Sequence, residues 1–231
     1  RAGAASFPSL DLVVGIDAAA SNLQYDLGDY KKAYTLQARA QARAEFLGAE
    51  YYLRGNLAAM AARIGRPEEA ESLMRGEVAR RRERLGANHP NVARAEFQLG
   101  AALLDGGRVS ESVPFFQSAI AIFERTPGPE HPDLAHFLGG LGEAFNRLGR
   151  LDEAARALRR AVALKTRVFG AEHRTLAESY GSLASNAEER GEWAECAAWL
   201  AKGAALLERE QPAGATTPLL YRVNQANALR E

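Results

Sequence analysis

The chain has 231 residues, which is enough for one large domain or two of ordinary size. Its 47% hydrophobic and 25% charged residues exclude a disordered tail and support a buried core. The formal net charge of zero removes the general electrostatic attraction to nucleic acid, and no apolar run approaches the roughly 20 residues that a membrane span needs. We therefore expect neither nucleic acid nor a membrane among its partners.

The first ten residues lack the features of a signal peptide, and we expect residues 1–10 to form an irregular lead-in or linker. Because the chain begins at Arg1 and not at a methionine, we expect it to be a piece of a longer protein. We expect that protein to be located in the cytoplasm. The excess of arginine over lysine, together with abundant alanine, points to a GC-rich bacterial genome. Cys196 is the only cysteine, which excludes an internal disulfide and a cysteine-based metal site.

A repeat of 42 residues runs through most of the chain. Glycines recur at this spacing, each preceded by a leucine at eight residues and followed by a glutamate at four. These columns are Gly65, Gly107, Gly149 and Gly191, then Leu57, Leu99, Leu141 and Leu183, then Glu69, Glu111, Glu153 and Glu195. Shorter columns add Gly86, Gly128 and Gly170, then His89, His131 and His173. Columns that keep one register without a slip indicate a repeat architecture.

The repeat begins with an irregular unit. Gly28, Tyr30 and Ala33 reproduce part of the repeated pattern, but the step from Gly28 to Gly65 is 37 residues, so the first unit is shorter. At the other end, residues 217–231 fit the first helix of a sixth unit and would cap the apolar face of the fifth. The expected units span residues 11–47, 48–88, 89–130, 131–172 and 173–212.

Each unit is predicted to hold two helices. In residues 132–148 the apolar side chains recur at spacings of three and four, the period of a helix: Leu134, Leu138, Leu141, Phe145 and Leu148. Gly149 ends this helix, because glycine enters the left-handed conformation at little cost. A second amphipathic run over residues 151–169 ends at Gly170. Pro90 and Pro132 fit the first turn of a helix, where no backbone donor is lost.

Small residues stand at fixed distances from each inter-helix glycine: Ala58, Gly100, Gly142 and Ala184 before it, then Ala70, Ser112, Ala154 and Cys196, then Glu77, Ala119, Ala161 and Gly203 after it. This arrangement resembles the tetratricopeptide repeat consensus. The 42-residue period with Leu-Gly-x-x-His-Pro between units is similar to the kinesin-light-chain type and its bacterial relatives. The resemblance implies an all-α superhelix, a solenoid of about five helix pairs. Glu77, a charged residue at a small position, predicts looser packing there.

The resemblance also implies that a peptide or partner segment binds along the concave groove formed by the first helices. Carried over by register, the candidate binding residues are Asn56, Arg63, Arg94, Phe97, Gln98, His136, Glu143, Asn146 and Arg147. The same register places Asp105, Glu178, Ser182, Glu188 and Glu189 on this face. An amide can donate and accept at once, and an arginine can pair with a carboxylate through two hydrogen bonds. Exposed helix surfaces are also ordinarily polar, so each residue has a second interpretation as plain solvated surface.

Two features of this face have further interpretations. Gly139 and Gly140 each cost a helix about 1 kcal/mol relative to alanine, and the reason is either tight helix packing or room for a ligand backbone. The family's Lys/Asn/Arg set for a terminal carboxylate cannot be assembled, because Gly55, Gly139 and Gly181 stand at its positions.

The charged and metal-binding residue types are predicted to be structural. The arginines between residues 75 and 84 form either a solvated face paired with Glu77 and Glu83 or a site for an acidic partner. Successive units lie roughly 10 Å apart, so the three turn histidines cannot gather on one ion at bonds of about 2 Å. We expect these histidines to form hydrogen bonds at helix starts.

The motifs of known catalytic sites are missing from the sequence: it has no Gly-rich phosphate loop, no His-Glu-x-x-His and no serine elbow. We therefore predict no enzyme, no cofactor and no metal. The leading hypothesis is a protein-interaction scaffold that binds a peptide or partner segment in the groove. The alternative is a regulatory or sensor domain of a larger bacterial signalling protein, such as a Ser/Thr kinase, a regulator or a caspase-like protease. In that case the partner includes the missing domains of the same chain.

Overall fold

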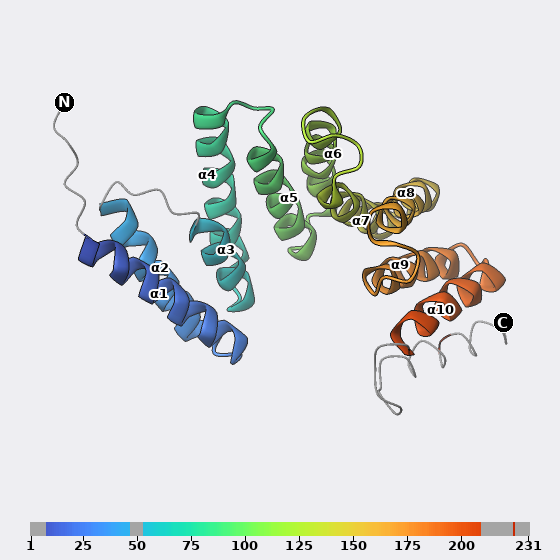
Figure 1. Cartoon of the computed structure of the whole chain (residues 1–231), viewed down its shortest axis with the longest axis horizontal. Helices are drawn as coiled ribbons and strands as arrows, with labels where there is room; N and C mark the ends of the chain where they lie inside the picture. The colour runs from blue at the N-terminus through green and yellow to red at the C-terminus, as the bar shows by residue number, and fades with distance from the viewer. Residues whose placement is uncertain (1–7, 47–52, 209–223, 225–231) are drawn as a thin grey trace. The chain divides into compact units, whose positions relative to one another are not determined.

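The computed structural model describes residues 8–46, 53–208 and 224, and within these residues it contains ten α-helices and no strand (Figure 1). The helices are α1 Pro8–Asp26, α2 Tyr30–Phe46, α3 Leu53–Arg63, α4 Pro67–Leu85, α5 Pro90–Asp105, α6 Val109–Arg125, α7 Pro132–Arg147, α8 Leu151–Phe169, α9 Thr175–Glu189 and α10 Trp193–Glu208. They pack in pairs in chain order, α1 with α2 through α9 with α10. The all-α fold of helix pairs predicted from the repeat is confirmed.

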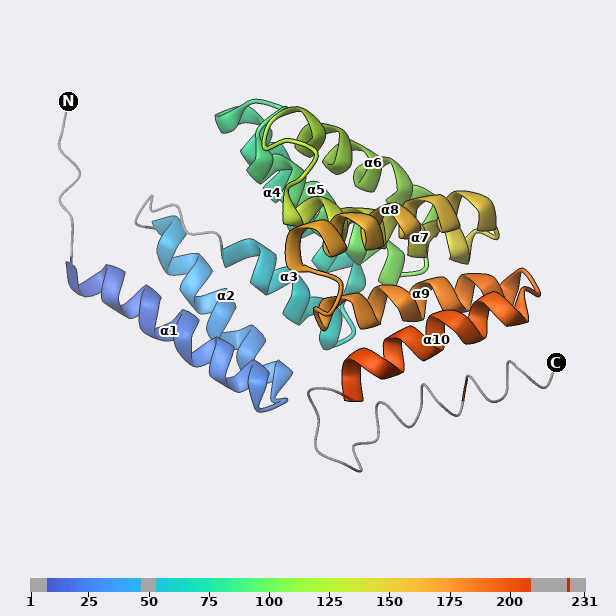
Figure 2. The same cartoon turned by 45° about the vertical axis from the view of Figure 1, so that its right-hand side comes forward.

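The chain divides into two compact units, residues 1–87 with α1 to α4 and residues 88–231 with α5 to α10. Within each unit every helix packs on the next one in the chain. In the second unit α7 also contacts both α5 and α9, the first helices of the neighbouring pairs. Figure 1 shows these three first helices following one another along one side of the second unit, with α6 and α8 on the other side. Figure 2 shows the same helices from a second direction.

A left-handed glycine joins the two helices of each pair. Gly149 has a φ of 69°, which an L side chain rarely adopts. Its amide donates to the Asn146 carbonyl at 2.9 Å, and the Arg150 amide donates to the Phe145 carbonyl at 2.9 Å, so the last carbonyls of α7 are satisfied. The equivalent glycines also have positive φ: Gly28, Gly65, Gly107 and Gly191. The predicted helix stops are confirmed.

Histidines begin the first helices of the later pairs. The Nδ1 atom of His131 accepts from the Asp133 amide at 3.1 Å, and that of His89 accepts from the Asn91 amide at 3.0 Å. Pro90 and Pro132 occupy the first helical turn directly after these caps. In the turn between α8 and α9, the Nδ1 atom of His173 lies 2.9 Å from the Thr175 hydroxyl oxygen. The histidines therefore form hydrogen bonds at helix starts, as predicted.

Small residues bring the helices of one pair close together. A Cβ atom on Gly142 would lie 2.6 Å from Cγ of Leu158, and one on Gly100 would lie 2.9 Å from the Phe116 ring. Such distances are well inside van der Waals contact, so a larger residue at either position would force the neighbouring Leu158 or Phe116 side chain to shift. The packing implied by the tetratricopeptide resemblance is confirmed at these pairs.

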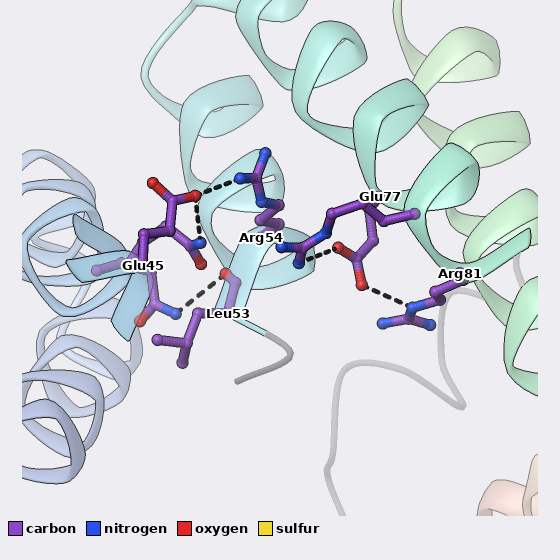
Figure 3. A network of polar contacts seen from close by, with 8 residues as sticks. Glu45, Leu53, Arg54, Glu77 and Arg81 are labelled. Carbon is purple, nitrogen blue, oxygen red and sulfur yellow. Dashed lines mark hydrogen bonds and ion pairs between the residues drawn. The ribbon is translucent and has the colours of Figure 1, made fainter. Parts of the chain in front are cut away.

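The expectation of loose packing at Glu77 is wrong. The Glu77 side chain is 2% exposed, and its two oxygens accept from Nε of Arg81 at 2.6 Å and from Nη2 of Arg80 at 3.2 Å. Figure 3 shows Glu77 pointing toward Arg81, with Arg54 and Glu45 paired beside them. The two guanidinium groups offset the cost of burying the carboxylate, so a charged side chain occupies a position where the other units have a small one.

The basic segment of α4 is paired along its own helix. Besides the two arginines on Glu77, Arg75 donates to Glu71 at 2.6 Å. The segment therefore carries ion pairs along its own helix, as the solvated-face interpretation expects.

The first pair of helices in unit one is joined by another buried carboxylate. Asp17 on α1 is 3% exposed and is paired with Arg39 and Arg43 on α2. The hydrogen bond from Arg39 is the largest of the effects that hold the pKa of Asp17 below its usual value. A depressed pKa means that this pairing stabilises the folded chain above the ordinary pKa of an aspartate and is lost as the pH falls below it.

Parts of two expectations fall outside the described residues. Of the predicted cap over 217–231 only Asn224 is described, and of the lead-in over 1–10 only the last three residues are, where α1 begins at Pro8. None of the described helices combines the length and apolar character needed to cross a membrane.

Replacing Glu77 by glutamine should lower the free energy of unfolding by about 1–3 kcal/mol, because the amide keeps the shape but removes the charge that offsets Arg80 and Arg81. Urea denaturation followed by circular dichroism measures this change. The matched control is Glu111→Gln, since Glu111 makes an exposed pair with Arg108. Its loss should stay below about 1 kcal/mol. Equal losses in the two variants would contradict a role for burial.

Candidate functional site

The second unit carries a pocket of about 220 Å³ between its first helices. Helices α5, α7 and α9 supply most of its lining, namely Phe97, Ala101, Leu104, Asp105, Ala135, His136, Gly139, Gly140, Glu143, Glu178, Ser179 and Ser182. Phe116, Leu158 and Lys165 reach it from the second helices α6 and α8. The pocket therefore lies on the face that the sequence predicts as the groove, within this unit.

Two successive glycines on α7, Gly139 and Gly140, line the pocket. Tight helix packing explains one of them, and open space surrounds the other. A Cβ atom on Gly140 would lie 2.9 Å from the Phe97 ring and 3.2 Å from the Phe116 ring, so this glycine is tightly packed. A Cβ atom on Gly139 would meet nothing within 4 Å. Gly140 thus lets α7 approach its neighbours, while Gly139 faces open space on the pocket side of the helix.

An aromatic cluster forms one wall of the pocket. The Phe97 ring is stacked on Phe137 with centroids 4.8 Å apart, and its centroid lies 4.5 Å from that of His136 and 5.3 Å from that of Phe116. Contacts with three rings hold Phe97 in place, so the wall is formed before any ligand arrives.

Polar groups from α8 and α9 also line the pocket. Nζ of Lys165 donates to Oγ of Ser179 at 2.7 Å and to the Thr175 carbonyl at 3.1 Å. Burial lowers the pKa of Lys165, with the nearby Glu178 carboxylate acting in the opposite direction. His136 keeps an exposed side, but desolvation by the neighbouring helices lowers its pKa below the usual 6.5, so its imidazole is mostly neutral at pH 7. Glu178 opposes this shift too, which places its charge near both groups.

The two predicted arginines of this unit are engaged within the protein. Arg94 donates to Asp133 at 2.7 Å and to Asn91 at 3.0 Å. Arg147 donates to the Leu104 carbonyl at 2.9 Å and to Glu143 at 2.6 Å. Both side chains therefore link α7 to α5 across neighbouring pairs.

Asn146 also links two first helices. Its Oδ1 accepts from Nδ2 of Asn186 on α9 at 2.7 Å, and the same nitrogen donates to the Leu151 carbonyl at 2.9 Å. The sequence reasoning missed Asn186, which is 2% exposed. A signal was present, because the equivalent residues of the two preceding units are Ala102 and Ala144. A buried amide in an alanine column requires a hydrogen-bond partner.

The predicted binding residues therefore fall into groups. Phe97, His136 and Glu143 line the pocket, and Gln98 is exposed on α5. Asn56 and Arg63 lie on α3 of the first unit, where both are exposed and the Arg63 guanidinium sits 5.8 Å from the centroid of the Tyr30 ring. Lys165 and Ser179 line the pocket but were not among the predicted residues. A signal for Lys165 was present, because it occupies the repeat position of the buried Phe123, where a lysine is unusual.

The described part of the chain contains no group of three or more His, Cys, Asp or Glu side chains that could hold a metal ion. Cys196 is buried on α10, and burial raises the pKa of its thiol.

Tetratricopeptide repeats match residues 49–125, 98–167 and 139–209. Together with the helix pairs, the left-handed glycines and the small residues between helices, this match shows that the chain belongs to the tetratricopeptide repeat family. Members of this family are generally protein-interaction modules. No curated protein matches the sequence.

Solved structures with the same fold include proteins of the kinesin-light-chain kind. A putative kinesin light chain from Podosopora anserina with nearly identical TPR-like repeats is 24% identical, with 77% of this chain and 84% of that chain covered and a TM-score of 0.69. BtubC (BKLC) from P. vanneervenii is 18% identical, with 89% and 85% covered and a TM-score of 0.74. These identities show the fold alone, and the predicted likeness to kinesin-light-chain repeats is confirmed at that level.

Alanine at the two neighbouring glycines should change stability in opposite directions. Gly139→Ala should raise the free energy of unfolding by about 0.5–1 kcal/mol, because alanine favours the helix and its methyl group meets nothing. Gly140→Ala should lower it by about 1 kcal/mol, since overpacking against Phe97 and Phe116 exceeds the gain in helix propensity. Urea denaturation of both variants checks the pair. If both alanine variants raise the free energy of unfolding, the Phe97 and Phe116 rings can shift to accept a methyl group at residue 140, and the prediction for Gly140 is wrong.

Proposed function

We propose that this chain is a protein-interaction scaffold, and that the groove of its second unit binds a peptide or a segment of a partner protein. The single observation that carries this proposal is the pocket between α5, α7 and α9, whose lining includes the open position at Gly139. A pocket built on packed helices needs little ordering on binding, so more of the interaction energy appears as affinity.

The size of the pocket favours a side chain of a longer segment over a whole small molecule. Small-molecule sites usually measure roughly 300–1,000 Å³, and this pocket measures about 220 Å³. A segment lying along the first helices would place one anchoring side chain in the pocket and leave its backbone outside. Gly139 leaves room for the segment to approach α7 closely.

The predicted residues take different parts in this proposal. Phe97, His136 and Glu143 contact the segment, with Gln98 beside them on α5. Arg94, Asn146 and Arg147 hold the first helices at fixed positions through the hydrogen bonds described above. Asn56 and Arg63 are proposed contacts on α3 of the first unit.

We propose further that the chain acts by binding alone, without catalysis, cofactor or metal, and that it acts in the cytoplasm. The family match supports this, because tetratricopeptide repeat proteins are generally scaffolds. We retain the proposal that residues 11–231 form one solenoid and that residues 217–231 cap its end.

A side chain placed in the pocket tests the groove directly. Gly139→Leu should abolish groove binding, because leucine occupies the open space, while the free energy of unfolding should not fall. A library of displayed 12-residue peptides is selected on the wild-type chain, and each recovered peptide is then measured on the variant. We expect the peptides that use the groove to lose at least about tenfold in affinity, or 1.4 kcal/mol.

The matched control introduces the same residue elsewhere, as Arg156→Leu at an exposed position of α8. It should leave peptide affinities unchanged. If the recovered peptides bind the Gly139→Leu variant as well as the wild type, the binding surface lies elsewhere and the proposal fails.

A further inference from the structure

The charges around the pocket are unbalanced. Helix α9 carries Glu178, Glu188 and Glu189 and no lysine or arginine. Asp105, the last residue of α5, adds a carboxylate to the lining. Within the described residues neither Asp105 nor Glu178 forms a side-chain hydrogen bond or a salt bridge. These two carboxylates of the pocket are therefore available to a ligand.

The cations near the pocket, in contrast, are held by groups of the protein. Arg147 is paired with Glu143, and Arg94 is paired with Asp133. Lys165 donates to Ser179 and to the Thr175 carbonyl, and the Glu178 carboxylate lies near it. The lining holds three carboxylates, Asp105, Glu143 and Glu178, against one lysine, Lys165, so even with Arg147 paired to Glu143 the charge around the pocket is negative.

The apolar wall adds a second requirement for the ligand. Phe97 presents an aromatic ring beside the neutral imidazole of His136. A positively charged group is attracted to an aromatic face, and the aliphatic stem of a lysine or arginine packs well on such a ring. A carboxylate, by comparison, would meet the ring face and the carboxylates of the rim, and the lysine of the lining, Lys165, already donates to Ser179 and to the Thr175 carbonyl.

We propose that the segment seated in this pocket is basic: lysine or arginine side chains of the partner pack a stem on Phe97 and direct their charged ends to the rim carboxylates, one to Asp105 and one to Glu178. This inference rests on the proposed function and adds the charge of the partner segment. It is independent of what the rest of the segment contains.

The peptide selection described above separates the inference from the function on which it rests. Peptides whose binding is lost in the Gly139→Leu variant define the groove binders, and we expect them to be enriched in lysine and arginine over aspartate and glutamate. Changing the basic residues of such a peptide to glutamine should weaken its binding at least about tenfold, and changing them to glutamate should weaken it further. Affinity for the basic peptide should fall as the salt concentration rises.

Variants of the two carboxylates locate the effect. Asp105→Asn and Glu178→Gln should each weaken binding of the basic peptide about three- to tenfold and leave binding of its glutamine-substituted form unchanged. The control Asp152→Asn removes a carboxylate that is 79% exposed on α8 and should change neither affinity. Thermal unfolding of each variant verifies that the fold is retained.

Three outcomes contradict these statements in distinguishable ways. Groove binders that are acidic, or that show no preference in charge, would overturn the inference and leave the proposed function standing. Basic groove binders that are insensitive to both carboxylate variants would overturn the contacts assigned to Asp105 and Glu178. Failure to recover any peptide that depends on Gly139 would overturn the proposed function itself.

Discussion

The close approach of the two helices in each pair is the constraint on which the second unit depends. At Gly142 the absence of a side chain lets Leu158 of α8 come so near that a Cβ atom would lie 2.6 Å from it. Because α6 and α8 pack this closely on α5 and α7 at Gly100 and Gly142, the first helices α5, α7 and α9 form a layer of their own. Side chains as distant in sequence as Phe97 and Ser182 then line the same pocket. The pocket is thus a consequence of the packing, and the residues that maintain the packing, such as Arg147 and Asn146, maintain the pocket as well.

Unit one shows how the same repeat accommodates charge in its interior. Glu77 and Asp17 are both almost fully buried, and each is paired with two arginines. A carboxylate surrounded in this way can replace a small apolar residue because its charge is offset locally, although the pair is sensitive to the loss of either partner. The second unit meets the position of Glu77 with Ala119 and Ala161, which need no partner. One fold therefore tolerates two different solutions for the contact between helices.

The fold could be predicted from the sequence because its determinants are local and repeated. A left-handed glycine, a histidine cap and a small residue between helices each act within a few residues, and the 42-residue register multiplies them. The site could be predicted only in part. The register placed Phe97, His136 and Glu143 on the face where the pocket lies, but it could not show that Arg94 and Arg147 are engaged by neighbouring helices. Lys165 was missed because it belongs to a second helix and reaches the groove through the length of its side chain. The burial of the Glu77 carboxylate depends on its ion pairs with Arg80 and Arg81, and a periodic pattern does not specify how those two side chains are oriented.

The open position at Gly139 has a practical consequence when it is considered together with Cys196. The natural thiol is the only one in the chain, and it is buried, with a pKa raised by that burial. It should therefore react slowly with thiol reagents, which require the thiolate. A cysteine placed at residue 139 would carry its sulfur into the open space beside α7, where a thiol reagent could be attached selectively. Such a group would fill the groove after the chain has folded, so occupancy of this one position could be controlled by chemistry.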